Sequence, residues 1–239
     1  MEKLYEGKAK IVYQSENPNH VIIYFKDEAT AFNAQKKDVI EGKGILNNKI
    51  SSIFFTLLNQ AGVKTHFIKQ ISDREMLAYK TKIIPIEVVV RNLATGSIVK
   101  RLGIPEKTEF NPPLIEFYYK NDALGDPIIC YEHVLVMKLA TEEDVKTIKE
   151  MALKVNEILR DFLIKHDIIL VDFKLEFGKL DDGTIVVADE ISPDTCRFWD
   201  AKTGERMDKD RFRLNLGDLA KFYQEVLERI EKWKKSEKL

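Results

Sequence analysis

The chain has 239 residues, 44% of them hydrophobic, which is enough apolar material for one large core or two modest ones. Charged residues make up 32%, but the two signs nearly cancel, and the formal net charge of −1 argues against a dedicated nucleic-acid or membrane-surface binder. No apolar run approaches the roughly 18 residues of a membrane-spanning helix, and two cysteines are too few for a disulfide framework, so we expect a cytoplasmic protein.

The first third of the chain is predicted to be rich in strands. Alternating apolar residues at 4–14 and 20–26 predict two strands, because successive side chains of a strand point to opposite faces. An apolar stripe at helical spacing runs from Leu46 to Ala61 and ends at Gly62, which predicts a helix. Short strands are expected around 65–71 and 75–80.

The rest of the chain mixes strands with a few long helices. Pro85 precedes a β-branched strand at 86–90, and residues 94–97 begin a helix that runs toward Leu102. Residues 108–131 contain three prolines and are expected to be loop-rich, with only short strands. A long amphipathic helix is predicted from Thr141, and a final helix from Asp218 to about Trp233.

This order of elements predicts the fold class. Strands cluster while helices stand apart, which favours an α+β fold with mostly antiparallel sheets. We place a hinge near Pro85, between a strand-rich N-terminal lobe at 1–84 and a larger α+β lobe at 85–239. Since a cleft between two lobes is a common place for a ligand, we expect the functional site there.

The segment 170–200 is the most informative part of the chain. Charged Asp172, Lys174 and Glu176 alternate with apolar residues, and an Asp-Gly pair at 182–183 predicts a hairpin with a two-residue type I′ loop. That loop places Glu176 opposite Asp189, whereas a three-residue loop would place it opposite Ala188. Facing carboxylates repel unless a cation lies between them, and oxygen ligands alone suit Mg²⁺. The alternative is a solvated charged face.

Two further stretches could bind phosphate groups. Lys8 and Lys10 lie two residues apart beside Gly7, so a strand would present both ammonium groups on one face. The alternative is an edge strand whose lysines discourage pairing with other chains. Arg91 ends a buried strand just before a helix that starts near Ser97, a combination that suits an anion. Otherwise Ser97 is a helix cap and Arg91 a surface charge.

Polar residues in two loops extend this set. Asp194 and Arg197 follow the hairpin directly, where the aspartate suits sugar hydroxyls and the arginine suits phosphate or carboxylate. An ordinary turn with an aromatic anchor is the alternative. Lys120 begins a polar loop at 120–127, and loops often carry function, although its spacing specifies no particular chemistry.

Several stretches of the chain match signature motifs of one family. They are YEGKAK at 5–10, TAFN at 30–33, GKGILNNKIS at 42–51, IPIEVVVRNLATGS at 84–97, KNDALGDP at 120–127, LVDFKLEFG at 170–178 and ADEISPDTCRFWD at 188–200. In this order and spacing, over nearly its whole length, the chain resembles the phosphoribosylaminoimidazole-succinocarboxamide synthases, or SAICAR synthetases.

The resemblance implies an ATP-dependent ligase of de novo purine biosynthesis. Such an enzyme joins L-aspartate to the carboxylate of 5-amino-1-(5-phosphoribosyl)imidazole-4-carboxylate, through an acyl phosphate, and releases ADP and phosphate. The implied two-lobed fold is similar to ATP-grasp and protein-kinase nucleotide folds, with ATP between the lobes. The implied cofactors are ATP and Mg²⁺.

The resemblance also implies roles for individual residues. ATP-binding residues would be Lys8, Lys10, Lys82, Glu87 and Lys120, and the segment Lys82–Glu87 would line the adenine pocket as the connection between the lobes. Glu176 and Asp189 would ligate Mg²⁺ and, with Lys174, form the catalytic group. Residues for the nucleotide substrate would be Arg91, Ser97 and Arg197 on its 5′-phosphate, and Asp172 or Asp194 on its ribose.

Two other function classes are left open. A small-molecule kinase would use the same ATP cleft but would need no aspartate. A non-catalytic nucleotide- or RNA-binding module would need a basic face with exposed aromatic residues, which the charge balance disfavours. We expect small-molecule partners, no nucleic acid or membrane, and a homo-oligomer, in the form of a dimer.

Overall fold

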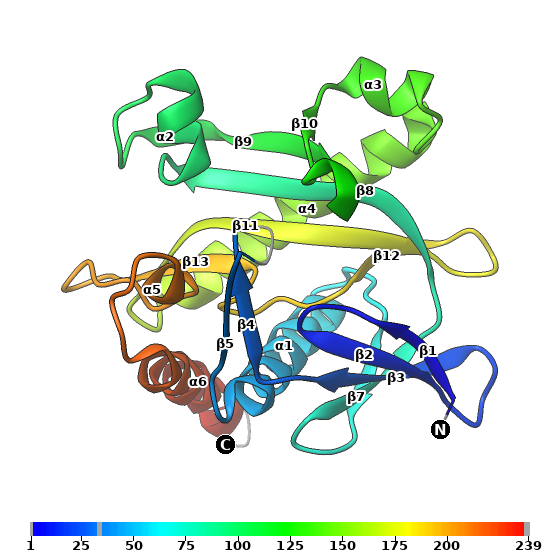
Figure 1. The fold of residues 1–239 in the computed structure, drawn as a ribbon, viewed down its shortest axis with the longest axis horizontal. Helices are drawn as coiled ribbons and strands as arrows, with labels where there is room; N and C mark the ends of the chain where they lie inside the picture. Colours follow the sequence, from blue (N-terminus) through cyan, green and yellow to red (C-terminus); the bar gives the residue numbers. More distant parts are fainter. Residues whose placement is uncertain (1, 33–34, 237–239) are drawn as a thin grey trace.

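The computed structural model describes residues 2–32 and 35–236, so Asn33 of the TAFN motif and residues 237–239 lie outside it (Figure 1). One sheet of five strands has the order β1-β2-β3-β7-β6 and pairs antiparallel throughout. Its strands are β1 (Lys3–Glu6), β2 (Lys10–Gln14), β3 (His20–Phe25), β6 (Phe67–Gln70) and β7 (Glu75–Tyr79). A two-stranded ribbon, β4 (Glu28–Ala31) and β5 (Lys36–Val39), stands beside it.

A second sheet has six strands, in the order β10-β9-β8-β11-β12, with β13 also paired to β11. Its strands are β8 (Lys82–Leu93), β9 (Glu109–Tyr119), β10 (Ile128–Ile129), β11 (Ile168–Lys179), β12 (Ile185–Ala188) and β13 (Cys196–Asp200). All its pairings are antiparallel as well. The predicted α+β class with mostly antiparallel sheets is therefore confirmed.

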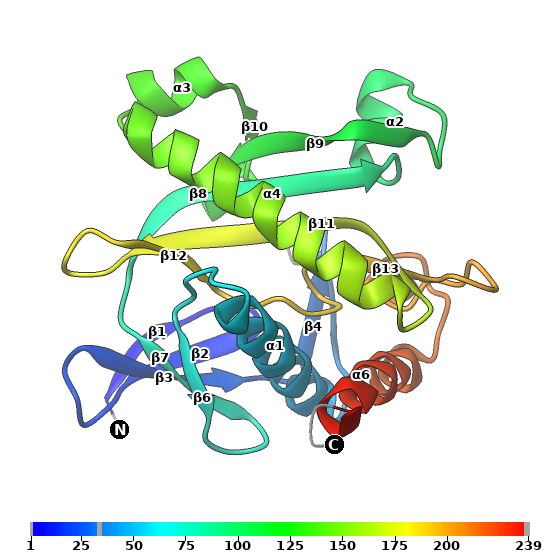
Figure 2. The same ribbon diagram turned by 180° about the vertical axis from the view of Figure 1, so that it is seen from behind.

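Three long helices cover the sheets. Helix α4 (Glu142–Ile164) crosses one face of the second sheet and contacts β11 and β8 (Figure 2). Helices α1 (Lys43–Gln60) and α6 (Leu219–Ser236) lie side by side below it. Short helices are α2 (Ser97–Leu102), α3 (Tyr131–Val136), α5 (Asp210–Arg213) and the 3₁₀ turn η1 (Asp122–Leu124). In the described part of the chain, no helix combines the length and apolarity needed to span a bilayer.

The predicted helices are confirmed at 46–61, from residue 97, from Thr141 and near 218–233, but several strand predictions need correction. The segment 4–14 forms two strands, interrupted at residues 7–9. Pro85 lies inside β8 and does not precede it. The register between β8 and β11 shifts between the pairs Glu176–Glu87 and Gly178–Ile83, and this irregularity accommodates a residue that has no backbone N–H to donate.

The expected loop-rich region at 108–131 instead contains the 11-residue strand β9. Its prolines, Pro112 and Pro113, fall where the register with β8 shifts, between the pairs Arg91–Leu114 and Leu93–Glu109. Because a bulge leaves residues without a ladder partner, prolines are tolerated there. Long-range pairing with β8 therefore overrides the local turn signals.

The β11–β12 hairpin has a different loop from the one predicted. Glu176 pairs with Ala188, so its predicted position opposite Asp189 is wrong. Leu180 and Thr184 close a three-residue loop, and within it only Gly183 has a positive φ, at 84°. A type I turn followed by a left-handed glycine needs one such residue, whereas type I′ needs two. Asp189 lies just beyond β12, with its own φ at 61°.

Candidate active site

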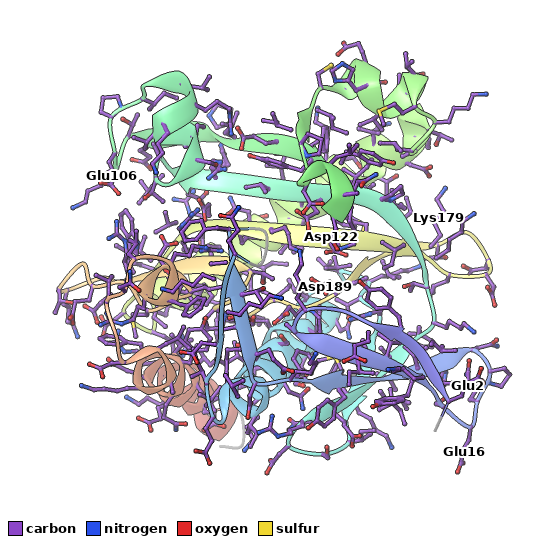
Figure 3. All side chains as sticks on the ribbon, viewed as in Figure 1. Glu2, Glu16, Glu106, Asp122, Lys179 and Asp189 are labelled. Atoms are coloured by element: carbon purple, nitrogen blue, oxygen red, sulfur yellow. The ribbon has the colours of Figure 1, made fainter. Side chains whose placement is uncertain are left out.

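A single cavity of about 1120 Å³ is lined by all the predicted site residues except Lys82. Strand β11 supplies one wall with Asp172, Lys174 and Glu176, which alternate with the core residues Phe173, Leu175 and Phe177. Asp122 and Asp189 lie near the centre of the view in Figure 3, where the two sheets face each other. Lys82 is exposed and pairs with Lys179 at the far end of β11.

Lys174 is at the centre of the carboxylates in this cavity. Its Nζ donates to Glu176 Oε1 at 2.7 Å and to Glu87 Oε1 at 3.0 Å, and it lies 3.5 Å from Asp189 Oδ2. The carboxylate facing Glu176 across strands is Glu87 on β8. The like-charged pair inferred from the hairpin therefore exists with a different partner. Glu176 and Asp189 nevertheless reach the same ammonium nitrogen.

Lysines from other elements complete these ion pairs. Lys10 Nζ donates to Asp189 Oδ1 at 2.5 Å and to Glu190 Oε1 at 2.6 Å, and Lys120 Nζ donates to Glu176 Oε1 at 3.0 Å. Lys8 Nζ donates to Asp122 Oδ1 at 2.7 Å. In residues 2–32 and 35–236, no three acidic, histidine or cysteine side chains are arranged to hold a metal by themselves.

These contacts shift the pKa values of the buried charges. Burial alone would lower the pKa of Lys174, but the negative charges of Glu176, Asp189 and Glu87 outweigh it and hold that pKa well above its ordinary value. For Asp189, burial alone would raise the pKa, but the charges of Lys10 and Lys174 lower it. Lys174 and Asp189 are therefore both held in their charged forms at neutral pH.

Two arginines form a second centre at the ends of β8 and β13. Arg91 donates to Asp172 Oδ2 at 2.8 Å and to Ser97 Oγ at 3.2 Å, and Arg197 donates to the same Asp172 oxygen at 2.9 Å. Asp210 holds Arg197 Nε at 2.8 Å. Both guanidinium groups are thereby fixed, and both line the cavity.

Gly96, at the start of α2, allows Arg197 to take this position. A Cβ atom at Gly96 would lie 2.5 Å from Arg197 Nη2, well inside van der Waals contact. Its φ of 66° and ψ of −129° also belong to a region that is essentially restricted to glycine. Arg197 therefore lies directly against the backbone that leads to Ser97.

Asp194, in the loop after β12, is held from two sides. Lys43 Nζ donates to its Oδ2 at 2.7 Å, and the Tyr223 hydroxyl donates to its Oδ1 at 2.6 Å. Burial alone would raise the pKa of Asp194, but the charge of Lys43 lowers it. This carboxylate is a fixed, ionised group on the cavity wall.

Several lining residues were not found from the sequence. Glu190, Lys209, Arg213 and His66 all line the cavity, and burial lowers the pKa of His66 to about 4. Lys209 and Arg213 belong to a dense run of charges at 208–213, which the buried Phe212 interrupts. Alternating charge beside a core residue was the only local signal, and it specifies no chemistry.

Comparisons with known proteins agree with one family. A family model described as SAICAR synthetase matches residues 3–230. A phosphoribosylaminoimidazole-succinocarboxamide synthase of Persephonella marina is 68% identical over 231 residues, which cover 97% of this chain and 97% of that protein. The corresponding protein of Coprothermobacter proteolyticus is 54% identical over 230 residues, covering 96% and 98%.

Solved structures agree with the sequence comparison. The crystal structure of a phosphoribosylaminoimidazole-succinocarboxamide synthase from Ehrlichia chaffeensis has a TM-score of 0.94 and 52% identity, and covers 96% of this chain and 98% of that one. A SAICAR synthetase in complex with ADP has a TM-score of 0.92 and 54% identity, with coverage of 95% and 96%. The family resemblance seen in the motifs is confirmed, and the chain belongs to the SAICAR synthetase family of ATP-dependent ligases.

Proposed function

We propose that this cavity is where the chain joins L-aspartate to the carboxylate of 5-amino-1-(5-phosphoribosyl)imidazole-4-carboxylate, using ATP and releasing ADP and phosphate. The observation that carries the proposal is the pairing of a lysine–carboxylate centre with a separate arginine centre in one cavity. A SAICAR synthetase of the same fold is known in complex with ADP, which supports a nucleotide in the corresponding place.

The chemistry suits these side chains. A carboxylate is a poor electrophile, so transfer of the ATP γ-phosphoryl group to it forms an acyl phosphate, and attack by the aspartate amine then expels phosphate. Phosphoryl transfer needs positioning and charge neutralisation more than covalent help from the protein. A site made of lysines, arginines and carboxylates supplies both.

We assign roles by location in the cavity. Lys8, Lys10 and Lys120 bind the phosphates of ATP, and the start of β8 lies beside adenine, where Ile83 and Glu87 line the cavity. Arg91, Ser97 and Arg197 bind the 5′-phosphate of the nucleotide substrate, because both guanidinium groups are fixed beside one hydroxyl. Asp172 or Asp194 accepts a ribose hydroxyl. Lys174 orients the carboxylates around it.

The donor set also fits Mg²⁺. Glu176 and Asp189 both face the region around the Lys174 ammonium group, so the two carboxylates would supply oxygen ligands to a cation bound beside it. Mg²⁺ takes oxygen ligands, commonly one or two carboxylates completed by water and substrate phosphates. When bound, it would neutralise the charge that develops on the transferring phosphoryl group.

The function is tested by measuring ADP release from the purified protein with ATP, Mg²⁺ and the nucleotide substrate, in the presence and absence of L-aspartate. We expect sustained release only when all are present, with one succinocarboxamide formed per ADP. Stoichiometric phosphorylation of the nucleotide without L-aspartate would instead identify a small-molecule kinase, and it would contradict the proposal.

The division into lobes at 1–84 and 85–239, a cytoplasmic location and a homodimer remain predictions. The two main sheets divide between residues 79 and 82, which supports a boundary in this region. Sedimentation at two protein concentrations, with a calculated monomer mass of 27.7 kDa, tests the dimer. A constant mass near that value would contradict it.

A further inference from the structure

Asp208 is a buried carboxylate that has no charged partner. None of its surface is exposed, and among the residues that the structure describes it forms no ion pair with a lysine or arginine. Its Oδ2 accepts from the Phe198 backbone N–H at 2.8 Å, and its Oδ1 accepts from the Asp210 backbone N–H at 2.7 Å. Because a buried charge without an opposite charge beside it is costly, Asp208 gives up its charge more readily than an ion-paired carboxylate does.

The surroundings of Asp208 hold its pKa near neutrality. Burial and the charge of Asp210 raise this pKa to about 7, although the Asp210 N–H and the charges of Arg197 and Arg213 oppose the rise. Tyr223 of α6 also faces Asp208, but burial holds the pKa of its hydroxyl well above the ordinary value, so it stays neutral. Burial would raise the pKa of Asp210, but the charges of both arginines, with which it is ion-paired, lower it. Asp208 can therefore change its charge at about pH 7 while Asp210 stays ionised.

Asp208 lies directly behind the arginine centre. Phe198, whose N–H it accepts, follows Arg197 in β13. The side chain of Asp210 accepts from Arg197 Nε and from Arg213 Nη1, at 2.8 Å each. The two arginines line the cavity, whereas Asp208 and Asp210 do not. An anion bound on the cavity side of these arginines would therefore face Asp208 across one layer of side chains.

The charges around this centre balance before a phosphate binds. Three guanidinium groups lie with three carboxylates, namely Arg91, Arg197, Arg213, Asp172, Asp208 and Asp210. A 5′-phosphate dianion adds two negative charges, and an added negative charge raises the pKa of a carboxylate nearby. Asp172 and Asp210 each accept from two guanidinium groups, which hold them in the charged form. Protonation of Asp208 is therefore the least costly way to offset part of the added charge.

We propose that the nucleotide substrate binds with uptake of a proton by Asp208, so that this buried carboxylate adjusts the charge of the arginine centre to the 5′-phosphate. The proposal rests on the proposed function, which supplies a phosphorylated nucleotide for this centre. A proton passes from solvent to a carboxylate oxygen of Asp208 as the phosphate binds, and it returns when the product, which keeps the 5′-phosphate, leaves. Binding is therefore tightest where Asp208 is protonated, and it weakens as the pH rises above about 7.

Isothermal titration calorimetry of the full chain with the nucleotide substrate, in buffers of different ionisation enthalpy, measures the proton uptake. At about pH 7.5 a 5′-phosphate is already a dianion, because its second pKa is about 6, so it contributes little to the proton balance. A rise of about one unit in the pKa of Asp208 on binding corresponds to uptake of roughly half a proton at this pH. We expect that value for the unmodified protein.

Asp208→Asn removes the titrating group and keeps its shape, so the uptake should fall to near zero. In the unmodified protein the KM for the nucleotide should rise roughly fivefold from about pH 7 to about pH 9, and in Asp208→Asn it should change by less than about twofold. Asp181→Asn, in the exposed loop after β11, is the matched control and should keep both the uptake and the rise. Should Asp208→Asn fail to fold, carboxyl ¹³C spectra of the unmodified protein, labelled at aspartate, provide the measurement. One resonance should titrate near pH 7, and nucleotide should raise its midpoint.

Three results would overturn the proposal. One is nucleotide binding to the unmodified protein without net proton uptake, and another is uptake that persists unchanged in Asp208→Asn. The third is the absence of an aspartate resonance whose midpoint lies near pH 7 and rises with nucleotide. Each of these leaves aspartate-dependent ADP release by the unmodified protein intact, whereas failure of the proposed function would abolish that dependence itself.

Discussion

At the scale of single residues, Lys174 keeps several carboxylates in one place. With Lys10 and Lys120 it balances Glu87, Glu176 and Asp189, which would otherwise repel one another in a partly buried cavity. Glu176 is the most enclosed of these carboxylates, with 4% of its surface exposed, and it forms ion pairs with two lysines, Lys120 and Lys174. Its carboxylate therefore contacts lysine side chains more than solvent.

Replacing Glu176 by glutamine keeps its shape but removes its negative charge. We expect turnover to fall roughly 100-fold or more, since a charged group that organises phosphoryl transfer is lost, and the Mg²⁺ concentration for half-maximal rate to rise. The melting temperature should stay close to that of the unmodified protein, because Lys174 keeps Glu87 and Asp189. Glu150→Gln, exposed on α4, is the control, and near-normal turnover in Glu176→Gln would contradict the metal assignment.

At the scale of elements, α4 illustrates how local sequence can determine a boundary. The Thr141 hydroxyl accepts from the Asp144 backbone N–H at 3.1 Å, and the Asp144 carboxylate accepts from the Thr141 N–H at 3.0 Å. This reciprocal capping satisfies two backbone donors that have no partner within the helix. Asp144 also pairs with Lys179 of β11, at 2.7 Å, which connects the helix start to the sheet.

We predict that Thr141→Ala lowers the free energy of unfolding by about 1 kcal/mol, the usual cost of losing an N-cap side chain. Urea denaturation followed by circular dichroism measures the change. Thr147→Ala makes the same substitution inside the same helix and should be neutral or slightly stabilising, because alanine has the higher helix propensity. Equal changes in the free energy of unfolding at the two positions would show that the Thr141 cap does not stabilise the start of α4.

The same elements explain what the sequence could predict. The apolar stripe of α4 and its start at Thr141 depend on local sequence, so both were predicted, whereas β9 depends on pairing with β8 across its prolines and was not predicted. The hairpin register depended on the φ of one loop residue, which an Asp-Gly pair does not determine. The proximity of Glu176 and Asp189 was predicted, but from a hairpin register that is wrong. The anchors of Asp194 were not predicted, because Lys43 and Tyr223 lie 151 and 29 residues away.

At the scale of the whole molecule, the two sheets share one core. A single cluster of buried apolar residues extends from Val21 in β3 to Ile230 in α6. Helix α1 packs against α6, and a parallel bridge joins Thr65 to Val187 next to the cavity. The first and last parts of the chain therefore support the same site, and we expect them to unfold together.

Two ion-paired carboxylates far apart in the chain, the half-buried Asp27 and the buried Asp200, predict acid sensitivity. Hydrogen bonds from Arg74 lower the pKa of Asp27 to about 2, and at Asp200 the Arg229 and backbone donors outweigh burial and lower the pKa to about 2. Lowered values mean that both groups stabilise the folded state above their unfolded pKa of about 4, and that this stability is lost as pH falls from about 4 to about 2.

We therefore expect the free energy of unfolding to fall between about pH 4 and pH 2, and Asp27→Asn and Asp200→Asn each to reduce this slope. Urea midpoints measured at several pH values provide the test. Asp161→Asn, exposed on α4, should leave the slope unchanged. An unaltered slope in both Asp27→Asn and Asp200→Asn would mean that other groups govern acid unfolding.

The alternation of cavity and core residues along β11 restricts insertions and deletions in this strand. Asp172, Lys174 and Glu176 line the cavity, while Phe173, Leu175 and Phe177 belong to the core. Inserting or deleting one residue between 172 and 176 would exchange these two faces from that point on, placing aromatic rings in the cavity and charges in the core. Only paired insertions or deletions would preserve both faces, whereas the exposed loop at 181–183 has no such restriction.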